Sequence, residues 1–413
     1  MTIREKFIIP KRYNNISIAL MTIGIIAIVA LYITHGASKD QHEQSRFWAS
    51  LLQNSVYFLL VTNASMFFIC ATTLAWGGWQ MSFRRVSEAI STCVPVIGVI
   101  ASVILLSICF SDNHTIYHWA DTEHVKHDPI LLYKSGFLNK GFFAVWTIIT
   151  IAGWSLLGWK MRRLSRSIDD HPLDLEGRKK FIWNNTVWAA LFIVFFALTV
   201  MSSIPWLWLM SIDAHWYSTM YSWYTWASTF VAGIALITLF VVFLKNNDYL
   251  ELVNQEHLHD LGKFMFAFSV FWTYLWFSQF MLIWYSNQPE ETIYFIRRIG
   301  NRVTISPYKA IFWLMFMMNF LAPLLILMTR GAKRNYTTIT FMSLLILFGH
   351  WLDFFQMVFP GPSPDHVPMI LYDFGIGLGF VGLIMFVTGR ALSKAPLLAK
   401  NHPFVKESVI HHT

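Results

Sequence analysis

Charged residues and cysteines are both scarce in this sequence, and each shortage excludes several classes of protein. Charged residues make up only 13% of the 413 residues, whereas a soluble domain usually carries about 25%. A chain this poor in charge cannot cover a surface that faces water, which excludes an ordinary soluble enzyme. The net charge is +8, but no basic stripe interleaved with aromatic residues lies outside the apolar stretches. We therefore expect the positive charge to orient the chain and contact lipid headgroups, and we expect no nucleic-acid partner.

The three cysteines, Cys70, Cys93 and Cys109, all lie inside apolar runs. No CxxC, CxxCH or HExxH motif occurs, so the sequence offers no ligand spacing for zinc, an iron–sulfur cluster or c-type haem. A b-type haem in a helix bundle usually needs two facing axial ligands, and His350 is the only histidine deep in an apolar run. We therefore expect this chain to bind no metal and no cofactor of its own.

Long apolar runs are what the sequence has in abundance, since 55% of its residues are hydrophobic. A membrane-spanning helix needs about 20 predominantly apolar residues. Such runs lie near 14–35, 54–79, 88–110, 141–160, 183–206, 217–244, 264–286, 309–329, 336–359 and 369–390. The polar segment 1–13 precedes the first run without a small-residue cleavage site, which favours a retained helix over a signal peptide. The sequence predicts an all-α integral membrane protein with about ten transmembrane helices.

The distribution of basic residues predicts the orientation of the chain. Ten spans place both termini on one side of the membrane. The segments on that side hold 22 of the 31 Lys and Arg residues, and the segments on the other side hold nine. By the positive-inside rule both termini are expected in the cytoplasm, which implies a multi-pass protein of a bacterial inner membrane.

A possible duplication divides the single membrane domain, 1–413, into two halves. The fourth and eighth spans each end in a basic patch, at 160–163 and 330–334, and similar polar openings follow, at 184–186 and 337–338. An offset of four helices preserves direction, so the pattern predicts two parallel four-helix bundles at about 49–206 and 217–359. The spans 14–35 and 369–390 would then flank them. The alternative is that short basic loops simply resemble one another.

The ninth span contains the most distinctive ionisable residues, in the stretch Gly349-His350-Trp351-Leu352-Asp353. The i, i+3 spacing places His350 and Asp353 on one helical face, and charge inside a bilayer is costly enough to suggest a function. Asp373, near the outer start of the tenth span, would continue the line. These three residues predict a proton path that opens outward. The alternative is a hydrogen-bonded pair that fixes two helices together.

Four further residues near the outer boundary are candidate entries to such a path. Asp213 and His215 interrupt a stretch rich in Trp and Tyr, as expected of an interfacial belt. Glu290 and Glu291 follow the seventh span. The alternatives are a loop cap for Asp213 and His215 and a solvated face for the two glutamates.

The outer loop 111–140 is rich in histidine and acid, but it has no recognisable metal-ligand spacing. A quinone headgroup needs hydrogen-bond donors for two carbonyls at the membrane boundary, beside an apolar slot for the tail. Tyr117, His118 and Asn139 have the side chains to supply such donors. They are the candidate quinone-binding residues, with menaquinol or ubiquinol as the substrate.

Several motifs resemble one family of membrane proteins. The stretches that carry the likeness are Leu261-Gly262-Lys263-Phe264, Phe277-Ser278-Gln279, Trp284 to Thr292 (WYSNQPEET), and Trp351-Leu352-Asp353 before Pro360. They are similar to the NrfD-like membrane subunits related to polysulfide reductase. The stretches 210–220 (MSIDAHWYSTM) and 117–119 (YHW) resemble the second of the two large NrfD-like subunits of alternative complex III, a bacterial quinol:cytochrome c oxidoreductase. The likeness extends over all ten spans.

The resemblance implies two four-helix bundles with two outer helices, and a role in the respiratory electron-transfer chain. It implies partners that carry the redox groups: a periplasmic iron–sulfur protein, haem c subunits, the sister NrfD-like subunit and, in some assemblies, a terminal oxidase. It implies proton translocation more than quinol oxidation for this subunit. The sequence departs from the family pattern in having Asp353 where many relatives have Glu, and uncharged Phe355-Gln356 where a basic residue often follows.

Two other functions compete with a proton-conducting subunit. One is a purely structural membrane anchor that holds periplasmic redox subunits and conducts nothing. The other is a stand-alone secondary transporter, a class that often shows inverted repeats and helices broken near the middle of the membrane. The repeat suggested here is parallel, which disfavours the transporter.

Overall fold

The computed structural model describes residues 5–169, 172–301 and 303–411, and the regular secondary structure of that part is helical apart from one isolated antiparallel bridge between Gly300 and Ile305. Ten helices or uninterrupted helical segments among the described residues are long and apolar enough to cross a membrane. The prediction of an all-α, multi-pass membrane protein is therefore confirmed. The spans, in order, are α1 (Lys11–Leu31) with η1 (Tyr32–Gly36); α2 (Gln41–Leu74); α3 (Arg84–Ile90) with α4 (Cys93–Phe110); α7 (Lys140–Arg166); α8 (Leu175–Leu198) with η4 (Thr199–Ser203) and α9 (Ile204–Trp208); α10 (Met220–Asn246); α11 (Gln255–Ser286); α13 (Lys309–Phe316) with η6 (Met317–Leu321) and α14 (Ala322–Ile326); α16 (Tyr336–Val358); and α17 (Ile370–Ser393).

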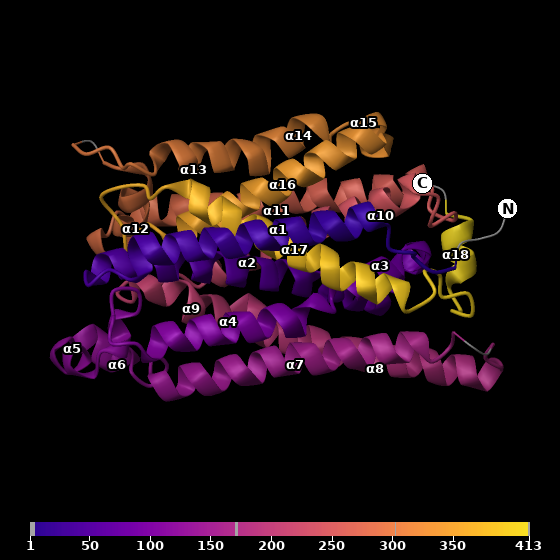
Figure 1. Cartoon of the computed structure of the whole chain (residues 1–413), viewed down its shortest axis with the longest axis horizontal. Helices are drawn as coiled ribbons and strands as arrows, with labels where there is room; N and C mark the ends of the chain where they lie inside the picture. The colour runs from indigo at the N-terminus through magenta and orange to yellow at the C-terminus, as the bar shows by residue number, and fades with distance from the viewer. Residues whose placement is uncertain (1–4, 170–171, 302, 412–413) are drawn as a thin grey trace.

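Short helices occupy the two ends of the molecule. One end, which we call the loop end, carries α5 (Thr122–His127), α6 (Pro129–Lys134) and α12 (Pro289–Ile299), as Figure 1 shows on its left side. The opposite end, the terminal end, carries α15 (Arg330–Arg334) and α18 (Val405–Val409). The two terminal segments meet there, because the Leu397 N–H donates a 2.8 Å hydrogen bond to the Glu5 carbonyl. Three short 3-10 turns complete the structure: η2 (Gly78–Ser82), η3 (His118–Ala120) and η5 (Met210–Asp213).

The second span differs from its predicted bounds of 54–79. Helix α2 begins at Gln41, where the Asp40 side chain caps it by accepting from the His42 N–H. The early part was missed because it contains Arg46, whose charge is neutralised inside the protein by Asp373. The helix ends at Leu74 because Trp76 adopts a left-handed conformation, with φ of 55°.

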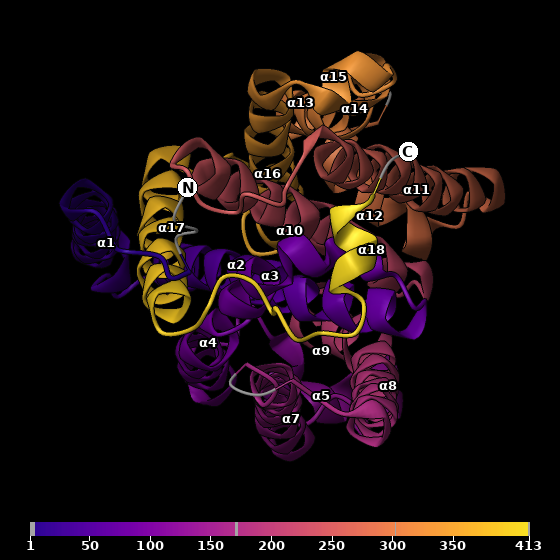
Figure 2. The same ribbon diagram turned by 90° about the vertical axis from the view of Figure 1, so that its right-hand side faces the viewer.

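Four spans of the first half form a closed ring of contacts, which we call the first bundle. Helix α2 packs against α4 and α8, and α7 packs against the same two helices from the other side. Figure 2, viewed from the terminal end, shows α4, α7 and α8 gathered on one side of α2. The second bundle consists of α10, α11, the α13–α14 span and α16, and it packs against the first through contacts of α2 with α10 and α16.

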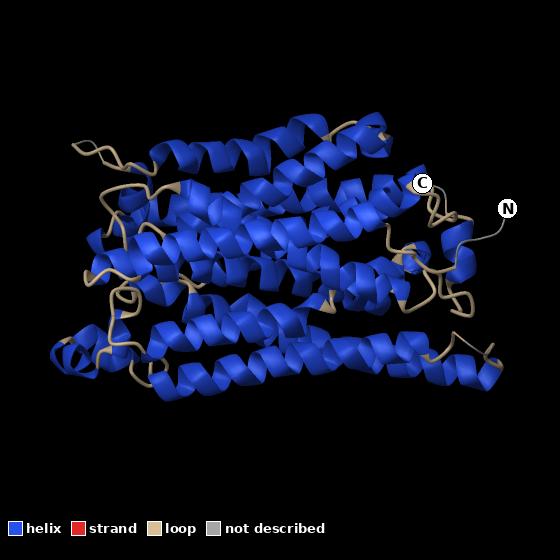
Figure 3. Cartoon of the chain, in the orientation of Figure 1, coloured by secondary structure: helices blue, strands red, loops and turns tan. Residues whose placement is uncertain are grey.

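The remaining spans, α1 and α17, lie side by side at the edge of the molecule and pack closely along their length. Their backbones nearly touch where Gly24 meets Gly379, since a Cβ built on Gly24 would lie 2.4 Å from the Gly379 Cα. Small residues of this kind allow helices to pack tightly in a membrane. Figure 3 shows that loops are confined to the two ends.

Two spans contain a five-residue π-helical segment followed closely by a proline. Segment η4 precedes Pro205, and segment η6 precedes Pro323. Proline lacks the N–H that an α-helix would use, and π segments often accompany such breaks. The two segments lie in the fifth and eighth spans, which an offset of four helices does not superpose. They therefore add nothing to the predicted duplication, which stays a prediction.

Candidate functional site

The site lies in the second bundle, where α16 brings His350 and Asp353 to the same buried face. Helix α16 starts at a defined cap, because the Asn335 side chain accepts hydrogen bonds from the N–H groups of Thr337 and Thr338 at 2.9 and 3.0 Å. His350 and Asp353 are both 0% exposed. The His350 Nδ1 lies 3.8 Å from the Asp353 Oδ2. The predicted pairing on one helical face is therefore present.

Three side chains from neighbouring helices donate hydrogen bonds to the Asp353 carboxylate. The Tyr224 hydroxyl of α10 donates to Oδ1. The Ser228 hydroxyl, one turn further along α10, donates to Oδ2 at 2.8 Å, and the Trp272 indole N–H of α11 donates to the same oxygen at 3.1 Å. Asp353 thus connects three helices of the second bundle, and each donor stabilises the charged form of the acid.

No cation balances Asp353. Within the described part of the chain, this carboxylate forms no ion pair with Lys or Arg. An acid inside a membrane is expensive to bury, and such acids are usually paired or functional. Hydrogen bonds from three neutral side chains therefore support Asp353, with His350 3.8 Å away.

Ser228 also links His350 to the acid, and this fixes a useful tautomer. Its hydroxyl oxygen lies 2.9 Å from the His350 Nδ1. A hydroxyl has one proton, so when Ser228 donates to Asp353 it accepts from the Nδ1–H of His350. Neutral His350 then carries its lone pair on Nε2. This nitrogen is buried and has no hydrogen-bonding partner among the described residues.

Asn319, in the π-helical segment η6, lies beside this pair. Its side chain is 0% exposed, and neither its oxygen nor its nitrogen has a hydrogen-bonding partner in the described chain. A Cβ built on Gly349 would lie 2.1 Å from the Asn319 Oδ1, so only glycine fits there, next to His350. Buried polar groups normally find partners. Asn319 and the His350 Nε2 are therefore buried polar groups of the second bundle that have no partner among the described residues.

A chain of aromatic and charged residues leads from Asp353 toward the loop end. Tyr224 packs near Tyr221, whose ring contacts that of Tyr294 on α12. Burial raises the pKa of Tyr294 to about 12; the Arg298 guanidinium lowers it, and the carboxylates of Asp353 and Asp213 raise it. Tyr294 is therefore close enough to respond to the charges of both the buried acid and an acid at the loop end.

Arg298 is buried within this region. Its guanidinium lies 3.4 Å from the centre of the Tyr294 ring and donates to the backbone carbonyls of Gln356 and Tyr294 at 2.9 and 2.7 Å. The preceding residue on the same helix, Arg297, forms a salt bridge with Asp213. Asp213 is therefore an ion-pair partner of α12. This is a structural role, similar in kind to the loop cap that is the alternative to a proton entry.

The other predicted entry residues lie at the loop end but are not joined to one another. The His215 Nε2 lies 2.5 Å from the Asp128 carboxylate. The Glu291 carboxylate accepts from Ser286 at 3.0 Å, and Glu290 is exposed in the first turn of α12. No hydrogen-bonded chain among the described residues connects these side chains to Asp353, so their role as entries stays a prediction.

Asp373 belongs to a separate site. Both of its carboxylate oxygens accept from Arg46 of α2, at 3.0 and 2.6 Å. Arg46 also donates to the Ser50 hydroxyl and lies 4.9 Å from the centre of the Phe359 ring. This closed pair joins α17 to α2. In the described chain no hydrogen bond links it to His350 or Asp353, so the structure does not bring the three predicted path residues together.

The candidate quinone-binding residues have much of their hydrogen-bonding capacity already engaged. The buried Tyr117 hydroxyl donates to the Trp208 carbonyl at 2.7 Å. Asn139 caps α7 by accepting from the Phe142 N–H at 2.8 Å, and its amide donates to two loop carbonyls. His118 is exposed. The quinone hypothesis for these three stays a prediction without geometric support.

An apolar cavity of about 270 Å³ lies elsewhere, between α2, α10, α16 and α17. Trp351 lines it, and its indole donates to Asn54 at 2.9 Å. None of the three candidate quinone-binding residues lines this cavity. The cavity has the shape of a slot for a hydrocarbon tail, but it offers such a ligand almost no polar group.

The path from His350 toward the terminal end is much less polar. The buried side chains of Ile346, Met342 and Met265 fill it. Ser343 is the polar exception on α16, and its hydroxyl donates to the backbone carbonyl of Ile339 and lies 3.6 Å from the Met265 sulfur. The second bundle is therefore more polar toward the loop end, its polar half, and mainly apolar toward the terminal end, its apolar half, where Ser269 and Thr238 are further buried hydroxyls.

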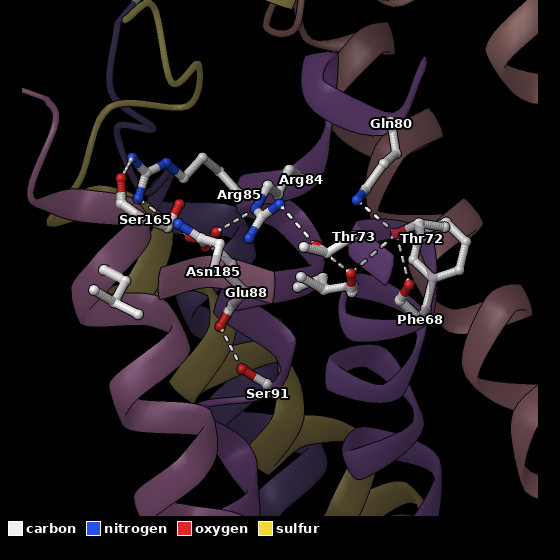
Figure 4. A network of polar contacts seen from close by, with 12 residues as sticks. Phe68, Thr72, Thr73, Gln80, Arg84, Arg85, Glu88, Ser91, Ser165 and Asn185 are labelled. Atoms are coloured by element: carbon white, nitrogen blue, oxygen red, sulfur yellow. Dashed lines mark hydrogen bonds and ion pairs between the residues drawn. The ribbon is translucent and has the colours of Figure 1, made fainter. Parts of the chain in front are cut away.

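A second buried charge cluster, which sequence reasoning missed, lies at the terminal end of the first bundle (Figure 4). The Glu88 carboxylate accepts from Arg84 at 3.0 Å and from Arg85 at 3.1 Å. Arg85 also pairs with Asp169 and donates to the Ser165 carbonyl at 3.1 Å. The signal was present in the Arg84-Arg85-x-x-Glu88 spacing, which places the charges on one face of a helix. In the sequence alone, Glu88 lies at the edge of the predicted span 88–110, with the two arginines outside it.

Among the described residues, no group of three or more His, Cys, Asp or Glu side chains is arranged to hold a metal ion. Comparisons with protein-family models and with curated proteins find no match for this chain.

Proposed function

We propose that this chain is a membrane subunit of a quinol-oxidising respiratory complex, and that its second bundle conducts protons. The observation that carries the proposal is the buried Asp353, which three hydrogen bonds support and which pairs with no Lys or Arg among the described residues. The resemblance to NrfD-like subunits supplies the context: haem c and iron–sulfur partners that carry the electrons, and a quinol that supplies electrons and protons. This chain itself needs no cofactor for the role.

The orientation in this proposal places the terminal end in the cytoplasm of a bacterium, within its inner membrane. The support is the excess of basic residues in the segments at that end. The polar half of the second bundle would then open toward the periplasm. Quinol oxidation near the outer face would release protons on the side that the polar half reaches.

The hydrogen bonds suggest how a proton would cross the site. His350 takes a proton at Nε2 and gives up the one at Nδ1 to Ser228, which passes its own proton to Asp353. The Asp353 carboxyl then exchanges its proton with the Tyr224 hydroxyl on the side of the loop end. The apolar half beside Ile346 and Met342 would have to admit water for this transfer to connect with the cytoplasm. Access through that half would then be the gated step.

Replacing Asp353→Asn tests the proposal. The complex carrying this variant is reconstituted into vesicles, and protons translocated per electron are measured during quinol oxidation by cytochrome c. We expect electron transfer to continue with a lowered proton-to-electron ratio, because an amide cannot take up and release the proton. The matched control is Asp365→Asn, which removes an exposed acid from a loop and should leave the ratio unchanged.

The alternative function is a structural anchor, and one observation favours it. The Asp353 carboxylate is fully hydrogen-bonded and links α10, α11 and α16, as a purely structural pin would. An unchanged proton-to-electron ratio in the Asp353→Asn complex would establish the anchor and reject the proton path. Purification through a tag on this chain separates both from a lone transporter, which would copurify with no haem and no iron.

A further inference from the structure

Figure 2 shows α4, α7 and α17 from the terminal end. A basic cleft opens there between α7, α17 and the N-terminal segment, with Thr92 at the start of α4 in its lining. Its volume is about 1000 Å³. Six basic side chains line it, from three separate parts of the chain: Lys6, Arg162, Arg163, Arg166, Arg390 and Lys394. Only two acidic residues, Glu5 and Asp169, share the lining.

Both acids in the cleft are already engaged by other cations. Glu5 pairs with Lys400 at 2.5 Å, and Asp169 pairs with Arg85. None of the six basic side chains forms an ion pair within the described residues. Glu88 lies near enough to Arg162, and Glu5 to Lys6, to interact electrostatically with them, but six cations against two acids in the lining leave the cleft with a net positive charge. An arrangement of this kind costs stability unless an anion occupies it.

Hydrogen bonds hold the two walls of the cleft in place. Arg162 of α7 donates to the Ala391 carbonyl at 3.3 Å, and Arg166 donates to the Lys394 carbonyl at 3.4 Å. These contacts tie α7 to the last turn of α17. The basic groups are therefore presented by two helices in a fixed arrangement, which a flexible surface patch would lack.

The cleft is basic toward the terminal end and apolar one turn deeper in the membrane. On α7, Trp159 precedes Arg163, whose guanidinium lies 5.3 Å from its ring centre. On α17, Phe386 precedes Arg390, whose guanidinium lies 4.2 Å from its ring centre. Trp159 is 57% exposed on the outer surface of the helices. Aromatic rings below basic groups match the boundary between acyl chains and headgroups.

We propose that this cleft binds an anionic phospholipid of the cytoplasmic leaflet, with a two-phosphate headgroup of the cardiolipin class. Basic pockets between transmembrane helices recognise headgroups of this kind. Six cations spread over two helices and the N-terminal segment are more than one phosphate group can contact. The aromatic and apolar side chains beneath them would receive the acyl chains. A soluble phosphate ion would leave this apolar half of the cleft unused.

Binding to the purified full chain, or to the complex in which it purifies, tests the assignment. Native mass spectrometry measures the affinity for tetraoleoyl cardiolipin, for dioleoylphosphatidylcholine and for inorganic phosphate. We expect the intact chain to prefer cardiolipin strongly. The double variant Arg163→Gln/Arg390→Gln should weaken cardiolipin binding about thirtyfold. Each basic group near an anionic lipid contributes about 1 kcal/mol to binding, and about 2 kcal/mol corresponds to that factor. These two arginines make no hydrogen bond to backbone across the cleft, so the fold should persist, and thermal unfolding checks this.

Two further variants give the comparison its controls. The double variant Lys180→Gln/Arg330→Gln removes the same charge from the terminal end outside the cleft, and it should keep the affinity within about twofold. The double variant Arg163→Lys/Arg390→Lys should keep most of it. Equal weakening by the two glutamine pairs would overturn the site, because the effect would then be net charge alone. Phosphate binding as tight as cardiolipin binding would overturn the lipid assignment.

Discussion

The two bundles place a tryptophan indole against an acceptor on the last helix of each bundle, but the acceptors differ in kind. In the first bundle the Trp154 N–H donates to the Thr199 hydroxyl at 3.0 Å. In the second bundle the Trp272 N–H donates to the Asp353 carboxylate at 3.1 Å. Both indoles are almost completely buried, at 1% and 0% exposed. One bundle therefore has a neutral acceptor where the other has an acid.

The bundles also differ in how they treat charge. One cluster of buried charges in the first bundle lies at the terminal end and is balanced, because Glu88 faces two arginines. The second bundle holds Asp353 deeper, with hydrogen bonds and no cation. A balanced cluster stabilises structure but cannot change its protonation cheaply, whereas an acid supported only by neutral donors can. The difference supports the proposal that the second charge site carries the proton chemistry and the first does not.

The largest expected effect comes from opening the balanced cluster. Replacing Glu88→Gln leaves Arg84 and Arg85 buried, at 1% and 3% exposed, with much of their charge uncompensated. We expect the free energy of unfolding to fall by about 3–5 kcal/mol, as when one partner of a buried pair is removed. Unfolding by sodium dodecyl sulfate in mixed micelles measures it.

The matched control for that variant is Glu176→Gln, which breaks an exposed pair with Lys179 at the same end of the molecule. Exposed pairs contribute little, so this change should leave the free energy of unfolding almost unaffected. Similar losses in the two variants would mean that the Glu88 cluster is not a buried stabilising site.

A sequence of this composition determines the membrane fold more completely than it determines the site. The ten apolar runs and the i, i+3 spacing of His350 and Asp353 are local patterns, and the structure confirms the spans and the shared face. The partners of Asp353 could not be predicted, because Tyr224, Ser228 and Trp272 lie about 80 or more residues away along the chain. Arg46 was missed for the same reason. Its charge argues against a place in a span, and the partner that neutralises it, Asp373, lies 327 residues further along the chain.

The arginines of the balanced cluster in the first bundle also lower the pKa of a nearby histidine. His402 packs against Phe181, and burial together with the charges of Arg84 and Arg85 lowers its pKa from 6.5 to about 3. The folded state therefore keeps His402 neutral, while the unfolded state takes up a proton below pH 6.5. Stability should fall as the pH drops from 6.5 toward 3, by about 2 kcal/mol at pH 5. Unfolding titrations at pH 7 and pH 5 measure this loss.

The control for His402 is His402→Asn, which removes the titrating ring and keeps an acceptor for the Phe404 N–H, now bonded to Nδ1 at 3.2 Å. The difference in stability between pH 7 and pH 5 should shrink by about 2 kcal/mol in this variant. An unchanged difference would show that other groups cause the acid sensitivity, and that the arginine charges do not reach His402.

The smallest effect compares the two indole hydrogen bonds directly and reports the charge of Asp353. Trp154→Phe and Trp272→Phe each remove one buried N–H. The side-chain volume lost is the same in the two variants, so their packing costs should be similar. A hydrogen bond to a neutral hydroxyl contributes about 1 kcal/mol, and one to a charged group contributes about 2 kcal/mol. Trp272→Phe should therefore lower the free energy of unfolding by about 1 kcal/mol more than Trp154→Phe at pH 7. The same measurement in an Asp353→Asn background removes the charge and should remove the excess. Equal losses in the original background would mean that Asp353 is already protonated at rest, so that the second bundle, like the first, holds a neutral acceptor until a proton leaves.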